Sequence, residues 1–437
     1  MDLFDKTALP DKVYLSGPDC FHLVLDKHAK KHNAGNNVMR IVFYFDKKVS
    51  CQKVEDILKR SALIYWLCNI RLVPGSLFNR PGWKYKDEGR EIIISEHMYS
   101  VESEIPQDIL NRDIPVDAQR FVECDIIHHP SGRSVLVFSW NHILMDGRGI
   151  SMFINHLNEI SNSANGGTVH FFPGKEKRTG VIEHIKNMYE VKKFIQTSSR
   201  SPIASVAGKN AKSATHFNNR VIYFTKEETT QIEENAFTNG ARFGANLFYL
   251  SCCAQVVNKI NQQRNTEGVI WLPIPYDGRL KGSFGPIISN AVAYLFYRIP
   301  VEALSNVKQT VAVFNHQMSE QLKIEMPRKY GMLLNMMRHI PLRLYYYLIN
   351  RTGDGSFSSF LYSSTGNNFN NINTLFDMPV RSLTIFPSTT FPPGLTFSFL
   401  KHADALNINV AYSSDIISNI ELESIEKGLR DLLVPNN

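Results

Sequence analysis

Residues 134–149 constrain the fold of this chain most strongly, because an apolar strand pattern runs directly into residues that break strands. The β-branched and aromatic side chains of residues 135–140 predict a buried β-strand. The Asp-Gly-Arg-Gly run that follows supplies the turn chemistry that ends it. His142 therefore lies at a strand end, where its side chain can be held by a sheet and still reach a ligand. Since an unperturbed imidazole has a pKa near ~6.5, His142 is a candidate general base.

A lone buried histidine is more often a core residue than a catalyst, so the spacing around His142 matters. The pattern His142-x-x-x-Asp146-Gly147 resembles the signature of chloramphenicol acetyltransferase, plant BAHD acyltransferases, bacterial wax ester synthases and nonribosomal peptide condensation domains. Residues 275–292, which include Asp277, Arg279 and Asn290, look like a second superfamily segment. Residues 391–415 and a helical pattern over 421–433 are similar to its C-terminal strands and last helix. The resemblance thus covers nearly the whole chain.

This resemblance implies an α/β (α+β) fold in which two chloramphenicol acetyltransferase-like lobes form a V around a central substrate tunnel. The chain would divide into an N-terminal lobe over 1–175, an interlobe connection over 176–216 and a C-terminal lobe over 217–437. The implied activity is acyl transfer from a thioester to a hydroxyl or amine acceptor, with His142 as general base. The expected protein is therefore an acyltransferase.

The resemblance also implies that Asp146 turns away from the substrate and pairs with Arg279, which would support the loop that carries His142. If that pair is buried, loss of either charge should damage the structure more than the proton transfer. Gly147 is expected to meet a backbone demand, a positive φ angle or a close approach, where the strand breaks.

Candidate substrate-binding residues are Asn141, Asn290, Ser363 and Ser364. Asn141 stands where condensation domains and wax ester synthases have the first of two adjacent histidines, which favours a free-standing acyltransferase over a peptide-forming domain. Asn290 matches an asparagine near the acyl site of relatives and could donate to the thioester or oxyanion oxygen, although a plain loop asparagine is the alternative. Ser363 and Ser364 could offer hydroxyls to the tunnel. The BAHD signature D-F-G-W-G is absent.

The composition of this 437-residue chain limits the kinds of partner that it can be expected to bind. The net charge is +7, but the basic residues are scattered along the chain and no nucleic-acid-binding motif accompanies them. We therefore expect no nucleic-acid partner. A positive field suits a phosphate-bearing co-substrate, either acyl-CoA or the phosphopantetheine thioester of an acyl or peptidyl carrier protein. No bound cofactor and no metal are expected. The six cysteines form no paired framework, no apolar run is long enough to span a bilayer, and the first residues lack an export pattern, so we expect reduced thiols in a cytoplasmic protein.

Several alternatives stay open at this stage. The apolar and basic segment 329–351 could touch a membrane surface, but core packing is the better interpretation. His128 and His129 could suggest a metal site, although a polar turn fits their spacing better. The chain could also be a free-standing condensation-type enzyme that uses carrier-bound substrates, or a non-catalytic carrier-binding scaffold. Acyl length, acceptor, donor type and oligomeric state are not determined by the sequence.

Periodicity predicts alternating strands and helices. We expect strands over 37–46, 90–94 and 121–127, then one amphipathic helix over 50–68 and another over 148–161. A second lobe would open with a strand near residue 219 and a helix that Thr225 begins.

Overall fold

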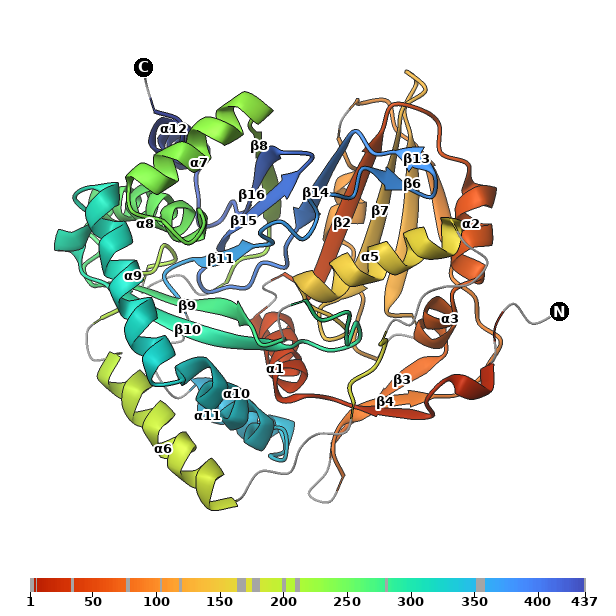
Figure 1. The fold of residues 1–437 in the computed structure, drawn as a ribbon, viewed down its shortest axis with the longest axis horizontal. Helices are drawn as coiled ribbons and strands as arrows, with labels where there is room; N and C mark the ends of the chain where they lie inside the picture. The colour runs from red at the N-terminus through yellow and green to blue at the C-terminus, as the bar shows by residue number, and fades with distance from the viewer. Residues whose placement is uncertain are drawn as a thin grey trace.

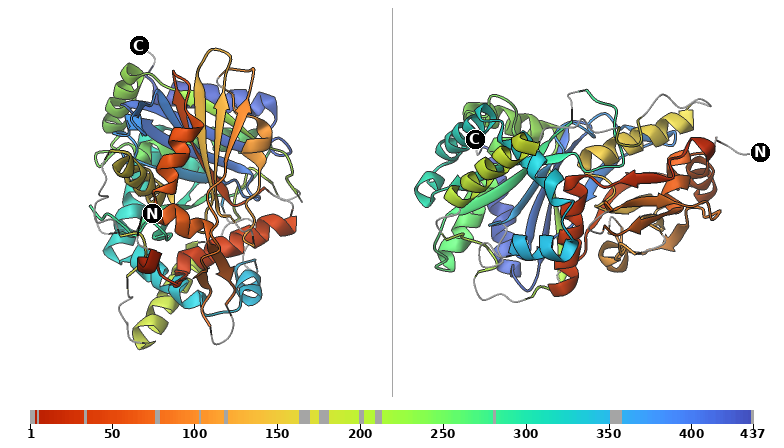
Figure 2. Two further views of the ribbon diagram at one scale, coloured as in Figure 1. Left: turned by 90° about the vertical axis from the view of Figure 1, so that its right-hand side faces the viewer. Right: turned by 90° about the horizontal axis from the view of Figure 1, so that it is seen from below.

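The computed structural model of the chain describes residues 4 and 6–435, apart from 33–34, 76–78, 103, 118–119, 163–169, 175–180, 199–201, 209–212, 280–281 and 351–357. Helices and strands are interspersed along the described chain in short runs of one kind, and Figures 1 and 2 show two lobes side by side with helix α1 (Gly17–His32) at their junction. The prediction of a two-lobed α/β protein is confirmed. The central tunnel stays a prediction.

The remaining helices and strands have the following bounds. The helices are α2 (Cys51–Lys59), α3 (Ala62–Cys68), α4 (Gln107–Asn111), α5 (Gly147–Asn162), α6 (Val181–Ser198), α7 (Lys226–Thr238), α8 (Asn246–Gln263), α9 (Val307–Lys323), α10 (Met326–Met337), α11 (Leu342–Asn350) and α12 (Asn419–Leu433), with short 3-10 turns at Lys6–Ala8 and Val301–Leu304. The strands are β1 (Lys12–Tyr14), β2 (Val38–Phe45), β3 (Ile70–Val73), β4 (Gly82–Tyr85), β5 (Ile94–Met98), β6 (Val122–His128), β7 (Ser134–Asn141), β8 (Phe217–Tyr223), β9 (Ile270–Asp277), β10 (Val292–Ile299), β11 (Leu361–Ser364), β12 (Thr374–Leu375), β13 (Met378–Pro379), β14 (Ser382–Phe386), β15 (Leu395–His402) and β16 (Ala405–Ser413).

A five-stranded sheet in the order β14-β2-β7-β6-β5 forms the centre of the N-terminal lobe. Strand β7 lies in its middle and is buried along its whole length, as its apolar sequence predicts. Alternate residues of β2 face two cores. Ile41 and Phe43 pack toward helices α2 and α5, whereas Val42 and Tyr44 pack toward α4. Because both faces of the sheet are covered along β7, a substrate could reach this strand only at its carboxyl end.

The C-terminal lobe is built on a four-stranded sheet in the order β11-β15-β16-β8. Helices α7, α8 and α12 share one apolar core with its strands. The antiparallel ribbon β9-β10 extends from this lobe toward α1, and α9 and α10 pack against β10. Helix α7 begins at Thr225 with a complete capping box, as predicted.

One strand of the C-terminal part of the chain joins the sheet of the other lobe. Strand β14 pairs antiparallel with β2, from Ser382 opposite Tyr44 to Phe386 opposite Arg40. Its outer edge faces β16, where the side chains of Asn407 and Asn409 donate to its main-chain carbonyls. The two lobes are therefore joined by hydrogen bonds as well as by the chain. The predicted boundary at 175/176 lies outside the described residues, so the division into domains stays a prediction.

Two local predictions were wrong. The expected helix over 50–68 is two helices, because Ser61 caps α3 by accepting a hydrogen bond from the main-chain N–H of Ile64. The strand expected over 90–94 begins only at Ile94. The side chain of Asn69 binds both the N–H and the carbonyl of Arg90, which removes those groups from sheet pairing.

Segment 329–351 spans most of α10 and all of α11. Helix α10 packs against α1, α6 and β10, and Leu334 and Tyr345 are buried. Leu344, Tyr347 and Leu348 are exposed on α11. Core packing thus accounts for most of the segment, and membrane contact stays a prediction. Among the described residues, no helix combines the length and apolar character needed to cross a bilayer.

Candidate active site

His142 is the first residue after β7, where the central strand leaves the sheet. Its main-chain N–H donates to the carbonyl of Asn37 at 2.8 Å, which extends the pairing of β7 with β2 by one residue. His142 is partly exposed, whereas Asn141 before it and Ile143, Leu144 and Met145 after it are buried. The sheet therefore fixes the main chain of His142, which keeps part of its surface exposed.

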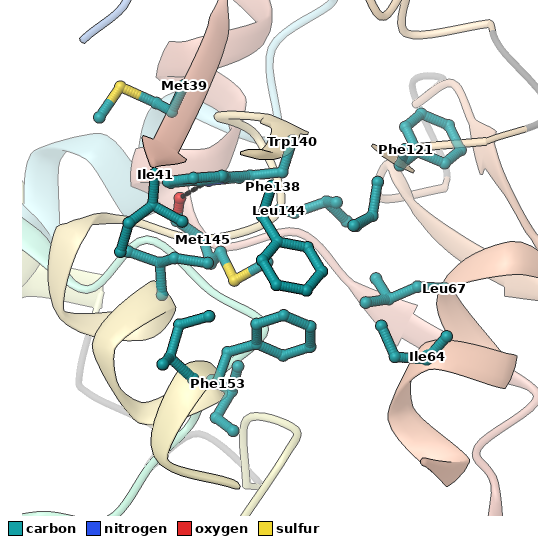
Figure 3. Packing of buried hydrophobic residues seen from close by; sticks show 14 of the residues in the cluster. Met39, Ile41, Ile64, Leu67, Phe121, Phe138, Trp140, Leu144, Met145 and Phe153 are labelled. Carbon is teal, nitrogen blue, oxygen red and sulfur yellow. Dashed lines mark hydrogen bonds between the residues drawn. The ribbon is translucent and has the colours of Figure 1, made fainter. Parts of the chain in front are cut away.

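The turn after His142 is held from within. The indole N–H of Trp140 donates to the carbonyl of Met145 at 3.0 Å, and Met145 packs in the same core as Phe138 and Phe153 (Figure 3). This hydrogen bond links the residue before the turn to the residue after it. A buried indole N–H needs a hydrogen-bond acceptor, and the carbonyl of Met145 supplies one. The same contact fixes the shape of the turn.

Asn141 does not have the position expected of a substrate-binding residue. Its side chain is fully buried, donates to the carbonyl of Ile114 at 2.7 Å and accepts from the N–H of Ile143 at 3.1 Å. Neighbouring residues of a strand point to opposite sides of the sheet, so Asn141 and His142 diverge. Asn141 therefore holds the turn from inside the fold.

Asp146 and Arg279 form the expected ion pair. Nη1 of Arg279 donates to Oδ2 of Asp146 at 2.8 Å, and the two side chains are 2% and 7% exposed. Main-chain N–H groups of Gly149 and Ala291 also donate to Asp146. With its oxygens taken in this way, Asp146 serves the structure of the turn and does not face the ring of His142 as a catalytic partner.

The expectation for Gly147 was wrong. Gly147 is the first residue of α5, its φ angle is not positive, and a Cβ added there would meet nothing within 4 Å. The crowded position is Gly149, whose Cβ would lie 2.8 Å from the carbonyl oxygen of Ile287. The close approach occurs two residues later because α5 itself packs against the segment that carries Arg279 and Asn290.

Asn290 is brought to His142, but not as an oxyanion donor. Its side chain is fully buried, and Nδ2 donates to the main-chain carbonyls of His142 at 2.9 Å and Ile143 at 3.1 Å. The same nitrogen donates to Oδ1 of Asp19 on α1 at 2.9 Å. The predicted donor is already used, so Asn290 instead ties the turn after β7 to α1 and to the C-terminal lobe.

The side chains of Ser363 and Ser364 lie on opposite faces of β11. Ser364 donates to Oδ1 of Asn246 at 2.8 Å and lines a cavity of about 370 Å³ beside α7 and α8, which does not include His142. Ser363 lies opposite Ser398 and alternates to the other face of β11, toward the N-terminal lobe. Only Ser363 therefore remains on the side of the lobe junction.

Sequence reasoning missed His22. Its ring stacks on that of His142, with centroids 3.9 Å apart and 23° between the planes. His22 is buried in α1, about 120 residues before His142, and no motif links the two. The only signal is that Asp19 and His22 are three residues apart, which places them on one face of α1.

Burial controls the protonation of this group of residues. It lowers the pKa of His142, while the residue's own main chain, Asp146 and Asn290 act in the opposite direction. Burial, together with the nearby His142, lowers the pKa of His22 well below its usual value. Burial raises the pKa of Asp19, and its hydrogen bonds from Asn290 and Ser16 oppose this. His142 is thus a neutral imidazole at pH 7, the form that can accept a proton.

No family model and no curated protein matches the sequence, but solved structures do. The first condensation domain of the CDA synthetase is similar with a TM-score of 0.68 at 13% identity, over 99% of this chain and 97% of that one. TRI3 trichothecene 15-O-acetyltransferase from Fusarium sporotrichioides gives 0.65 at 12% identity, over 97% and 95%. Polyketide synthase associated protein 5 from Mycobacterium tuberculosis gives 0.63 at 13%, over 98% and 100%.

This chain has the condensation-domain fold. At such identities the likeness concerns the fold, so residue roles must come from the geometry of the chain itself. Within the condensation-domain fold, this chain places a partly exposed neutral histidine between two lobes. Among the described residues, no group of three or more histidine, cysteine or acidic side chains could hold a metal ion, and His128 and His129 bind Ser134, Glu96 and the main chain of Tyr99 instead. The described cysteines are all unpaired.

Proposed function

We propose that this protein transfers an acyl group from a thioester to a hydroxyl or amine acceptor, with His142 as general base. The observation that carries the proposal is the contrast at the end of β7, where His142 alone is partly exposed in a buried turn. Hydrogen bonds from Asn290 and to Asn37 fix its main chain from both lobes. A base so held costs little entropy to orient toward a reacting group.

In the proposed reaction, His142 removes the proton of the acceptor O–H or N–H as that atom attacks the thioester carbonyl. The tetrahedral intermediate then collapses, the carbon–sulfur bond breaks, and the proton held by His142 passes to the leaving thiolate. The products are an ester or amide and a free thiol, and His142 returns to its neutral form. General-base catalysis by histidine contributes ~10²–10⁴-fold, so placement of the two substrates must supply most of the remainder.

The donor would be acyl-CoA or an acyl or peptidyl group on a carrier protein, since both present a phosphopantetheine thioester. The net charge of +7 favours such phosphate-bearing donors. The other reading is a carrier-binding scaffold in which His142 does no chemistry.

Thiol release from a panel of acyl-CoA and acyl-carrier donors, with pooled alcohol and amine acceptors, tests the proposal. Parent protein should release thiol only when an acceptor is present, and His142→Ala should lose at least ~10²-fold. His316→Ala, at an exposed position on α9, is the matched control and should keep full activity. Equal rates in parent and His142→Ala would refute the general base, while carrier binding without any turnover would identify a scaffold.

A further inference from the structure

The stacked rings of His22 and His142 join a helix of the N-terminal lobe to the candidate base. Their centroid distance of 3.9 Å and interplanar angle of 23° describe a stacked, face-to-face contact. His22 is 7% exposed, so its ring forms a buried wall against one face of His142. A substrate group can therefore approach His142 only from its other sides.

Helix α1 is anchored so that this wall cannot shift easily. Asp19 accepts from the main-chain N–H of Asn290 at 2.7 Å and from its Nδ2 at 2.9 Å, and Ser16 donates to the carbonyl of Asn290 at 3.3 Å. His22 lies one turn after Asp19 on the same face. The N–H of Gly17 donates to Oδ1 of Asn335 on α10 at 2.9 Å, which fixes the start of the helix.

The orientation of the His142 ring needs such a wall. Catalytic histidines are usually oriented by a carboxylate or carbonyl that accepts a hydrogen bond from Nδ1. Nδ1 of His142 is buried, and no other residue of the described chain forms a hydrogen bond with it. Nδ1 of His22 is likewise buried without a partner. No other residue holds the ring of His142 by a hydrogen bond at Nδ1, so ring contact with His22 holds it together with the hydrogen bond to the residue's own main chain.

We propose that His22 is a positioning residue for His142, which it holds by stacking against the face of its ring. The inference rests on the proposed function, because it gives His22 a part in the same reaction. Among the described residues, charged groups near the pair include Asp146, which is bound to Arg279, and Asp19, one turn before His22 on α1. Both rings are neutral at pH 7 as burial lowers each pKa, and two imidazolium rings in contact would repel each other.

Three variants test the proposal: His22→Ala, His22→Phe and, as control, His156→Ala. His22→Ala removes the wall, so kcat should fall about tenfold with little change in KM, and the acid limb of the pH profile should move up toward ~6.5 as water reaches His142. His22→Phe keeps an aromatic face and should retain most of kcat. His156→Ala removes a buried histidine on α5, so it should lower stability without moving the pH profile.

NMR titration of the His142 side chain in histidine-labelled protein gives a readout that does not need activity. The His142 resonance should shift in His22→Ala through loss of the ring current and return close to its parent position in His22→Phe. A folded His22→Ala protein with unchanged His142 titration, kcat and pH profile would overturn the proposal. A parent without acyl transfer, but with the expected NMR changes, would instead refute the proposed function and leave the stacked pair standing.

Discussion

Arg279 donates through Nη1 to Oδ2 of Asp146 at 2.8 Å, across the boundary between the turn after β7 and the loop after β9. Oδ1 of Asp146 accepts from the N–H of Gly149 at 2.8 Å, and Nη2 of Arg279 donates to the carbonyl of Ser289 at 3.0 Å. The pair therefore fixes the start of α5 and the segment of Asn290 in one arrangement. Its function is to shape the site.

We expect Asp146→Asn to destabilise the fold by about 3–5 kcal/mol, because it leaves the buried guanidinium of Arg279 without its close counter-ion. Urea denaturation of parent and variant measures this loss. Asp277→Asn is the matched control, since Asp277 lies 3.5 Å from the same guanidinium but is 39% exposed, and it should cost less than ~1 kcal/mol. Equal stability of Asp146→Asn and parent would show that the pair does not support the fold.

The pH dependence of acyl transfer follows from the lowered pKa of His142. A general base must be neutral, so activity is lost as pH falls through the pKa of His142 in the folded protein. Because burial lowers that pKa, the acid limb of kcat/KM should lie below the ordinary histidine value of 6.5. Rates measured with one donor and one acceptor between about pH 4 and pH 8 locate the limb. A midpoint above 6.5 would contradict the geometry of the site.

His156 should make the fold sensitive to mild acid. It is 5% exposed, neither ring nitrogen has a hydrogen-bond partner among the described residues, and burial lowers its pKa to about 4. The unfolded chain takes up the proton near 6.5, so folding stability is lost as pH falls from ~6.5 to ~4, by about 3 kcal/mol.

The measurement is the free energy of unfolding of parent and His156→Phe across that pH range. Phe removes the titrating group and keeps a ring of similar size beside Phe171, which contacts His156 at 4.7 Å between centroids. The variant should lose less stability on acidification by roughly that amount. Parallel pH curves for the two proteins would mean that His156 is protonated at no cost in the folded state.

The asparagines of β16 should stabilise the junction of the lobes. Nδ2 of Asn409 donates to the carbonyl of Ile385 at 3.0 Å, on the outer edge of β14. Asn409→Ala leaves that buried carbonyl unpaired and should cost about 1–3 kcal/mol. Thermal unfolding compares it with Asn371→Ala, an exposed position that should be neutral. A neutral Asn409→Ala would show that water replaces the amide.

Sequence patterns predicted the local features of this protein because those features depend on near neighbours. The apolar run of β7, the strand end at His142 and the capping box of Thr225 each arise within a few residues. The pairing of Asp146 with Arg279 came from family resemblance. Local patterns failed where a distant side chain intervened, as when Asn69 took the hydrogen bonds of Arg90 and delayed β5.

Tertiary structure alone decided which side chains surround the candidate base. His22 and Asn290 lie about 120 residues before and 148 residues after His142, and only the packing of α1 and of the loop before β10 brings them there. The crossing of β14 into the other sheet was equally hidden. Contacts of this kind are selected by the shape and hydrogen-bonding needs of the folded lobes, which no short sequence pattern records. The sequence by itself determined the position of His142 at a strand end, whereas the folded lobes determined its neighbours.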